Sequence, residues 1–235
     1  MNRDLFIKQI LPATVDITPI GRISDELSPE EFAPVAEQFF ADILEIHKAD
    51  ISGLEGYGEF DEENQLEAAT LRQFLVEEFS EEKEGYWKNW TQMFETTMLS
   101  KAFFYKYYDK MLEYAAYCEG KRFLVNNNTF FCNMIVKEDG RVGFPDWSRS
   151  GVCDFLLDFA IMDLNKPYLQ IPEKLYDYFK KNDIKAEHFH ERFLCMAYYK
   201  GIATLMWHAS IDDEESCISI MKSISELEER IWAIK

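Results

Sequence analysis

Apolar residues recur at every third or fourth position in long stretches of this chain, a spacing typical of helices that bury one face. The stretch that follows Ser28 is the clearest example. It opens with Ser28-Pro29-Glu30-Glu31, which supplies a capping side chain, a proline suited to the first helical turn and early acidic residues. Its apolar positions at helical spacing are Phe32, Val35, Phe39, Ile43 and Ile46. A helix is therefore predicted from Ser28 to about Lys48.

The same periodicity predicts further helices over residues 66–79, 86–119, 152–162, 173–181, 186–209 and 213–234. The segment 86–119 is rich in Trp, Phe and Tyr, and an aromatic stripe of this kind is typical of a packed core, with a ligand-stacking surface as the alternative. The glycine-containing stretch from Ile51 to Asn64 is predicted to be a flexible loop. The chain is thus expected to be mainly α-helical.

Short apolar runs separated by turn residues predict a small β-structure in the middle of the chain. Phe123 to Val125 is one run, and the asparagine triplet at 126–128 suits a tight loop because Asn tolerates left-handed backbone conformations. A second run, Phe131 to Val136, is followed by the turn Lys137-Glu138-Asp139-Gly140 and a returning strand over residues 141–147. The expected fold class is therefore α+β, with helices dominant and a β-hairpin.

This hairpin carries two polar side chains, Asn133 and Asp146, one on each arm. An amide and a carboxylate placed in this way could share an oxygen-preferring cation such as Mg²⁺. The alternative is that Asn133 is an ordinary strand residue and Asp146 a turn or helix-start residue. The spacing alone leaves both interpretations open.

Length and composition favour one compact domain over residues 1–235, because 47% of the residues are hydrophobic and can bury a substantial core. The net charge of −18 argues against a nucleic-acid partner, which requires a basic face. It would attract a polycation, although solubility alone also explains an acidic chain.

Five widely spaced cysteines form no Cys-x-x-Cys pair, and this usage is typical of reduced thiols in the cytoplasm. The amino-terminal residues lack the apolar core of a signal peptide, and no window is long and apolar enough to predict a membrane span. The four histidines, at 47, 188, 190 and 208, do not have the spacing of a metal site. A cytoplasmic protein is expected.

The segment from Arg122 to Ala160 resembles the catalytic and metal-binding region of the aminoglycoside phosphotransferase family. The family pattern is His-Gly-Asp, four residues, Asn, a hairpin that ends in Ile-Asp-Trp, a Gly-Asp pair and Asp-Phe-Ala. Here Asn126-Asn127-Asn128 stands in place of His-Gly-Asp, Asn133 matches the metal-binding Asn, and Pro145-Asp146-Trp147 matches the Asp-Trp. The later matches are Gly151, Asp154, Asp158, Phe159 and Ala160.

Weaker similarity, strongest to the hygromycin phosphotransferase branch of the family, extends over roughly residues 15 to 230 and includes Gly53, Gly56 and Gly58. The resemblance implies a protein-kinase-like carboxyl-terminal lobe, ATP and Mg²⁺ as cofactors, and Asn133 and Asp146 as metal ligands. A substrate pocket for a cationic aminocyclitol would be lined by carboxylates, and Asp154 and Asp158 are the first candidates. The acidic runs at 59–63 and 212–215 are further candidates, although such runs are usually solvated faces or helix starts.

Asn128 occupies the position of the family's catalytic Asp, with Asn126 at the position of its His. A neutral amide cannot take a proton from a substrate hydroxyl, and general-base help is typically worth about 10²–10⁴-fold in rate. Because phosphoryl transfer depends mainly on positioning and charge neutralisation, Asn128 could still orient a hydroxyl. Weak residual transfer is compatible with this replacement, but efficient turnover is not expected.

The nucleotide-clamping amino-terminal β lobe of kinase-like enzymes is expected to be absent. Only residues 1–20 precede the recognisable part, too few for a five-stranded lobe, and they are interpreted as a remnant of the lobe connection. No Gly-rich phosphate loop is found, so no nucleotide-binding residue can be named. Three hypotheses follow: an impaired relative that binds a cationic ligand, an active kinase completed by a partner chain or a homodimer, and a non-catalytic interaction module or eroded remnant.

Overall fold

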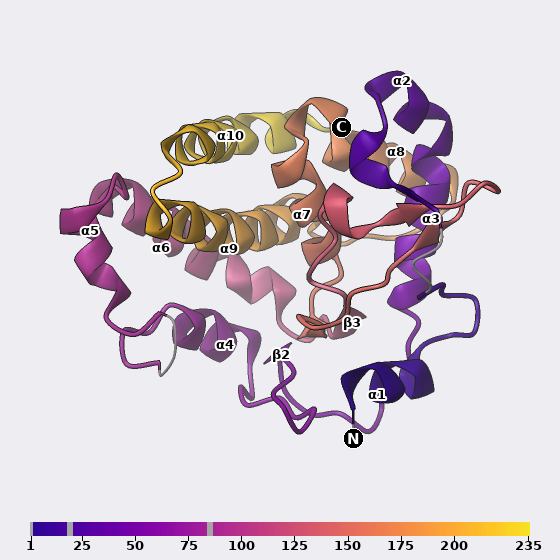
Figure 1. The fold of residues 1–235 in the computed structure, drawn as a ribbon, viewed down its shortest axis with the longest axis horizontal. Coiled ribbons are helices and arrows are strands. Elements are labelled where there is room, and N and C mark those ends of the chain that lie inside the picture. Colours follow the sequence, from indigo (N-terminus) through magenta and orange to yellow (C-terminus); the bar gives the residue numbers. More distant parts are fainter. Residues whose placement is uncertain (1, 18–20, 84–86) are drawn as a thin grey trace.

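The computed structural model describes residues 2–17, 21–83 and 87–235 (Figure 1). The amino-terminal half contains the helices α1 (Arg3–Ile10), α2 (Pro29–Phe32), α3 (Ala36–Ile46), α4 (Leu71–Glu78), α5 (Met93–Thr96) and α6 (Lys101–Cys118). The carboxyl-terminal half contains α7 (Leu156–Asn165), α8 (Ile171–Lys181), α9 (Phe189–Ser210) and α10 (Glu214–Ala233). The described residues form a mainly helical α+β fold.

The helix α9 lies at the centre of the helical part and packs against α6, α7 and α10. Figure 1 shows α10 running beside α9 along one edge of the molecule. At their contact, a Cβ added to Gly201 would lie 2.7 Å from Ile224 Cδ1, so the glycine permits the close approach of the two helices. Residues on all sides of α9 are buried, as is typical of a helix without a continuous polar face.

Two small antiparallel sheets lie beside the helices. One has the strand order β1 (Arg22–Ile23), β4 (Ile135–Val136) and β5 (Val142–Gly143), and the other has the order β2 (Gly58–Glu59), β6 (Gly151–Cys153) and β3 (Phe123–Val125). In the second sheet, a Cβ added to Gly151 would lie 1.9 Å from the carbonyl oxygen of Gly58. The β2–β6 pair therefore depends on a glycine at position 151.

Several elements predicted from the sequence are confirmed. Ser28 caps α2 in a reciprocal capping box with Glu31, and helical structure continues through a short 3₁₀ segment into α3. The predicted hairpin is β4–β5, and its turn is closed by the Gly140 N–H, which donates to the Lys137 carbonyl at 3.0 Å. Its predicted arms are too long, because Phe131–Asn133 is a 3₁₀ segment and Asp146 lies beyond the end of β5, so neither Asn133 nor Asp146 is on a strand. The predicted flexible loop at 51–64 contains the strand β2. None of the described helices combines the length and apolar character needed to cross a membrane.

Three predicted helices are wrong in extent. The segment predicted at 66–79 is helical only from Leu71, because the Thr70 hydroxyl accepts from the Gln73 N–H and begins the helix there. The segment predicted at 86–119 is interrupted: α5 ends before an extended Thr97, and Ser100 caps a new helix, α6. The starting residue of that prediction, Tyr86, lies outside the described residues.

The third correction concerns residues 152–162, which were predicted to be helical throughout. Residues 151–153 instead form β6, and α7 begins at Leu156. The Asp154 carboxylate causes the change, because its Oδ1 accepts the Leu156 N–H at 3.0 Å at the helix start. Asp154 also forms a two-point ion pair with Arg192 of α9, with distances of 2.7 and 2.9 Å.

The Asp154–Arg192 pair is buried, with Asp154 fully inaccessible to solvent. Replacement Asp154→Asn leaves an uncompensated buried guanidinium, so the free energy of unfolding is expected to fall by about 3–5 kcal/mol in urea titrations. The matched control is Glu226→Gln, which removes the exposed pair with Lys222. Exposed pairs contribute about 0–1 kcal/mol. Equal losses for the two variants would contradict the anchoring role of Asp154.

Candidate functional site

The asparagine triplet forms a loop directly after β3, and a single buried carboxylate on α7 fixes its backbone. Asp158 is 0% exposed and accepts the Asn126 N–H at 3.1 Å and the Asn127 N–H at 2.8 Å. The Thr129 hydroxyl donates to the Asp158 carbonyl at 2.6 Å, and His47 Nε2 lies 3.2 Å from Asp158 Oδ2. Hydrogen bonds to a carboxylate are stronger than those between neutral groups, so this carboxylate holds the start of the loop tightly.

The middle residue, Asn127, has a left-handed backbone with φ of 55°. Its amide nitrogen donates to Glu59 Oε1 at 2.8 Å and to the Arg149 carbonyl at 3.2 Å. Its amide oxygen accepts from the Lys200 ammonium at 2.8 Å, and the same ammonium reaches the Asn127 carbonyl at 3.2 Å. Asn is among the residues that adopt this backbone conformation most readily, and here its side chain is satisfied at both ends.

The Asn128 side chain joins the two predicted metal ligands. Its amide nitrogen donates to Asp146 Oδ2 at 2.8 Å, and its amide oxygen accepts from Asn133 Nδ2 at 2.8 Å. The Asn126 amide nitrogen donates to the Asp146 carbonyl at 2.7 Å, while its amide oxygen accepts the Asn128 N–H at 3.2 Å. Asn126, Asn128, Asn133 and Asp146 therefore lie together as one hydrogen-bonded cluster.

Charge in this cluster is low, because Asp146 is its one ionisable side chain. That carboxylate is exposed, and its Oδ1 also accepts the Ser148 N–H at 2.9 Å. No general base other than Asp146 contacts Asn128 in the hydrogen bonds of the described residues. The amide of Asn128 both donates and accepts here, a combination that an ionised carboxylate at the same place could not provide.

The residues around Asp146 supply only part of the oxygen ligands that Mg²⁺ requires. Asp146 and Asn133 supply hard oxygen donors, and Mg²⁺ is often held by one or two carboxylates together with water and substrate phosphates. Among residues 2–17, 21–83 and 87–235, no group of three or more His, Cys, Asp or Glu side chains is placed to hold a metal. These residues would suit a cation that arrives with phosphate ligands rather than a closed protein site.

The two carboxylates predicted to contact substrate, Asp154 and Asp158, are both buried and bind other residues of the chain. Asp154 pairs with Arg192, and Asp158 anchors the loop, and both are 0% exposed. Neither carboxylate faces solvent, so the interpretation of these residues as ligand-contacting groups is replaced by structural roles. The acidic run at 212–215 forms the start of α10, where Asp213 accepts the Ser216 N–H at 3.1 Å.

Sequence reasoning missed Lys200, Arg149 and His47, and assigned Glu59 only to an acidic run. The Lys200 ammonium lies in the protein interior, and burial, assisted by the nearby charge of Arg149, lowers its pKa to about 7. Glu59 accepts from Arg149 at 2.7 Å and from Asn127. No local pattern marks these residues, since Lys200 is 73 positions from Asn127 and His47 is 111 from Asp158.

No protein-family model and no curated protein matches the sequence. Solved structures do match. A ternary complex of a thermostable aminoglycoside phosphotransferase APH(4)-Ia mutant with AMP-PNP and hygromycin B superposes with a TM-score of 0.73 at 19% identity, over 97% of this chain and 82% of that chain. The enzyme without the stabilising changes gives 0.73 at 18% identity, over 97% and 81%, and a mutant complex with ADP and hygromycin B gives 0.71 at 18%, over the same shares.

Similarity at this level of identity shows the fold: this chain has the architecture of an aminoglycoside phosphotransferase. The kinase-like fold expected from the sequence is thereby confirmed.

The depressed pKa of Lys200 predicts a pH dependence of stability. The unfolded chain keeps this proton up to the ordinary pKa of 10.5, whereas the folded chain releases it from about 7. The contribution of Lys200 therefore rises with pH between these values, at up to about 1.4 kcal/mol per pH unit. We expect the difference in unfolding free energy between wild type and Lys200→Met to shift in favour of wild type from pH 7 to 8.5.

The control for this measurement is Lys222→Met, which removes an exposed ammonium. The difference in unfolding free energy between Lys222→Met and the wild type should stay constant over the same pH range. A Lys200→Met difference that is equally flat would mean that the Lys200 ammonium does not deprotonate in the folded protein.

A second prediction concerns Asn128→Asp, which places two carboxylates where Asn128 Nδ2 and Asp146 Oδ2 are now 2.8 Å apart. Like charges at this distance disfavour ionisation, so the variant should lose about 1–3 kcal/mol of stability in EDTA. Millimolar Mg²⁺ should restore much of this loss, while the wild type should respond little. The double variant Asn128→Asp/Asp146→Asn removes the repulsion and is the control; a variant insensitive to Mg²⁺ would contradict the prediction.

Proposed function

We propose that this chain is a catalytically impaired aminoglycoside phosphotransferase-like protein that binds a cationic ligand of the aminocyclitol type. The observation that carries the proposal is Asn128, which stands at the position of the catalytic carboxylate and is hydrogen-bonded to Asp146 and Asn133. Its amide cannot accept a proton from a hydroxyl, and its oxygen is already used by Asn133. In this proposal, the asparagine loop occupies the position of the family's catalytic loop but lacks a general base at residue 128.

Charge supports the ligand class. A net charge of −18 creates a field that attracts polycations and raises their local concentration. The structural neighbours include complexes with hygromycin B, which supports a ligand of this class. Asp146 is the exposed carboxylate beside Asn128 and is the residue we assign to an incoming ammonium group.

We also propose that this chain corresponds to the carboxyl-terminal lobe of such an enzyme. One feature supports this assignment. The sheets among the described residues have three strands each, with two or three residues per strand, unlike the five-stranded lobe that covers nucleotide phosphates in kinase-like enzymes. Nucleotide would then be held weakly, through Mg²⁺ at Asp146 and Asn133, and this Mg²⁺ would compete with the ammonium group for the Asp146 carboxylate.

The test combines binding and transfer. Calorimetric titration with hygromycin B should show saturable binding that weakens with added salt, because charge attraction is screened. Incubation with radiolabelled ATP, Mg²⁺ and hygromycin B should give at most trace phosphorylated product, at a rate about 10²-fold or more below that of an ordinary enzyme. Turnover at the roughly 1–10³ s⁻¹ common for enzymes would overturn the assignment of impaired catalysis. Absence of hygromycin binding would remove the proposed ligand class.

The variant Asn128→Asp separates the two proposed defects. Restoring the carboxylate alone should not restore efficient transfer if no nucleotide clamp is present, although hygromycin binding should remain within about twofold of the wild type. The comparison variant Asp146→Asn should weaken ligand binding more than Asn128→Asp does. Robust transfer by Asn128→Asp with no added partner would show that the chain clamps ATP and that the missing base was its only defect.

A further inference from the structure

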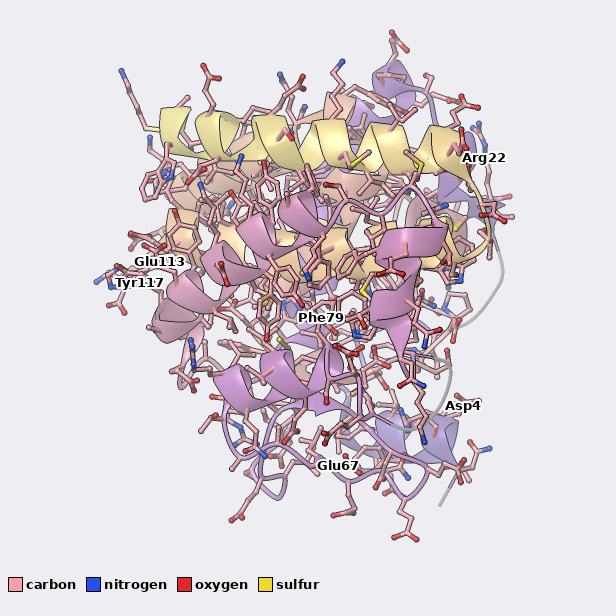
Figure 2. All side chains as sticks on the ribbon, turned by 90° about the vertical axis from the view of Figure 1, so that its left-hand side faces the viewer. Asp4, Arg22, Glu67, Phe79, Glu113 and Tyr117 are labelled. Carbon is pink, nitrogen blue, oxygen red and sulfur yellow. The ribbon has the colours of Figure 1, made fainter. Side chains whose placement is uncertain are left out.

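A groove outside the loop cluster combines aromatic rings with carboxylates. It has a volume of about 290 Å³ and lies where α4 ends, facing α6. Figure 2 shows this face of the molecule, with Phe79 near its centre between α4 and α6. The lining residues are Phe79, Ser80, Glu81, Glu82, Trp90, Phe104, Tyr105 and Tyr108.

The aromatic wall is rigidly built. Trp90 packs on Phe104 with ring centroids 4.6 Å apart, and Phe104 stacks on Tyr108 at 5.8 Å. The Trp90 indole N–H donates to the Phe79 carbonyl at 3.1 Å and fixes the indole in place. Tyr105 closes this wall on the solvent side, with 38% of its surface exposed and its ring 6.2 Å from that of Tyr108. Because Phe104, Trp90 and Phe79 are buried, the rings that a ligand can contact directly are those of Tyr105 and Tyr108.

The carboxylates lie on the open side of the groove. Glu81 and Glu82 are both exposed, and Glu81 is held in place by the Thr91 hydroxyl, which donates to its Oε2 at 2.6 Å. Both residues also line an adjoining hollow of about 570 Å³, together with Lys88 and Asn89. Among the described residues that line the aromatic groove itself, two carry carboxylates and none carries a cationic side chain.

Aromatic faces and carboxylates attract the same kind of ligand. A ring presents a negative face to a cation, and the interaction strengthens when the cation is partly desolvated. A protonated or quaternary ammonium with alkyl substituents matches both features, because its carbon atoms pack on the rings while its charge is balanced by the carboxylates. A neutral aromatic ligand would gain nothing from the charge of the carboxylates, and an anion would be repelled by it.

We propose that this groove binds a small organic ammonium cation. The groove lies near the asparagine loop, because the Phe79 ring packs against Tyr199 at 6.1 Å and Tyr199 precedes the loop-binding Lys200 on α9. It has its own lining, however: within the described part of the chain, none of its lining residues is a hydrogen-bond partner of Asn126, Asn128 or Asp146. The proposal therefore does not depend on the proposed function. A protein with an unimpaired catalytic loop could equally have this second cation site.

The test uses choline as the probe and 3,3-dimethylbutan-1-ol, its uncharged carbon isostere, as the comparison. Calorimetric or NMR titration of the full chain should give saturable choline binding and at least about tenfold weaker binding of the neutral isostere. The double variant Glu81→Gln/Glu82→Gln should weaken choline binding about tenfold. Tyr105→Ala, at an exposed ring, should weaken it by a similar factor.

The matched control is Glu67→Gln/Glu113→Gln, which removes the same charge from two exposed glutamates located away from Phe79 on this face (Figure 2). It should change choline affinity by no more than about twofold, an effect of net charge alone. Circular dichroism establishes that each variant is folded. Equal binding of choline and its isostere, an equal loss in the control variant, or no choline binding at tens of millimolar would each overturn the proposal.

Discussion

The organisation of the site depends on one interaction: the fully buried Asp158 carboxylate accepts two consecutive backbone N–H groups of the asparagine loop. This places the start of the loop against α7, which lies beside α9 in the helical part of the fold. The fixed backbone directs the three asparagine side chains toward different partners. Asn127 turns toward Glu59 and Lys200, while Asn126 and Asn128 face Asp146.

The chemistry of the loop follows from the amide at position 128. A carboxylate there would face Asp146, and two like charges so close together would require a cation to balance them. The amide instead donates to Asp146 and accepts from Asn133. The same backbone can therefore be stable without a cation.

Features encoded by neighbouring residues were predictable, and those that depend on distant residues were not. The capping box at Ser28 and the turn at Gly140 are local, and the structure confirms both. The sequence does not reveal the break in the aromatic segment 86–119, because the apolar spacing continues across Ser100. In the structure, Ser100 is the capping residue at the start of α6. The role of Asp154 in an ion pair is not visible in the sequence, because its partner, Arg192, lies 38 positions away.

The close approach of β2 and β6 limits how this protein can change. A side chain at Gly151 would collide with the Gly58 carbonyl, and Gly58 itself has a φ of 114° and faces the Phe74 ring. The strand that contains Gly58 also contains Glu59, which holds Asn127. A mutational library directed at the asparagine loop would thus find positions 58 and 151 closed to variation, although both lie outside the loop, and Gly151 pairs with Val125 directly before it. The side chains of the site can vary, whereas the backbone crossing of β2 and β6 cannot.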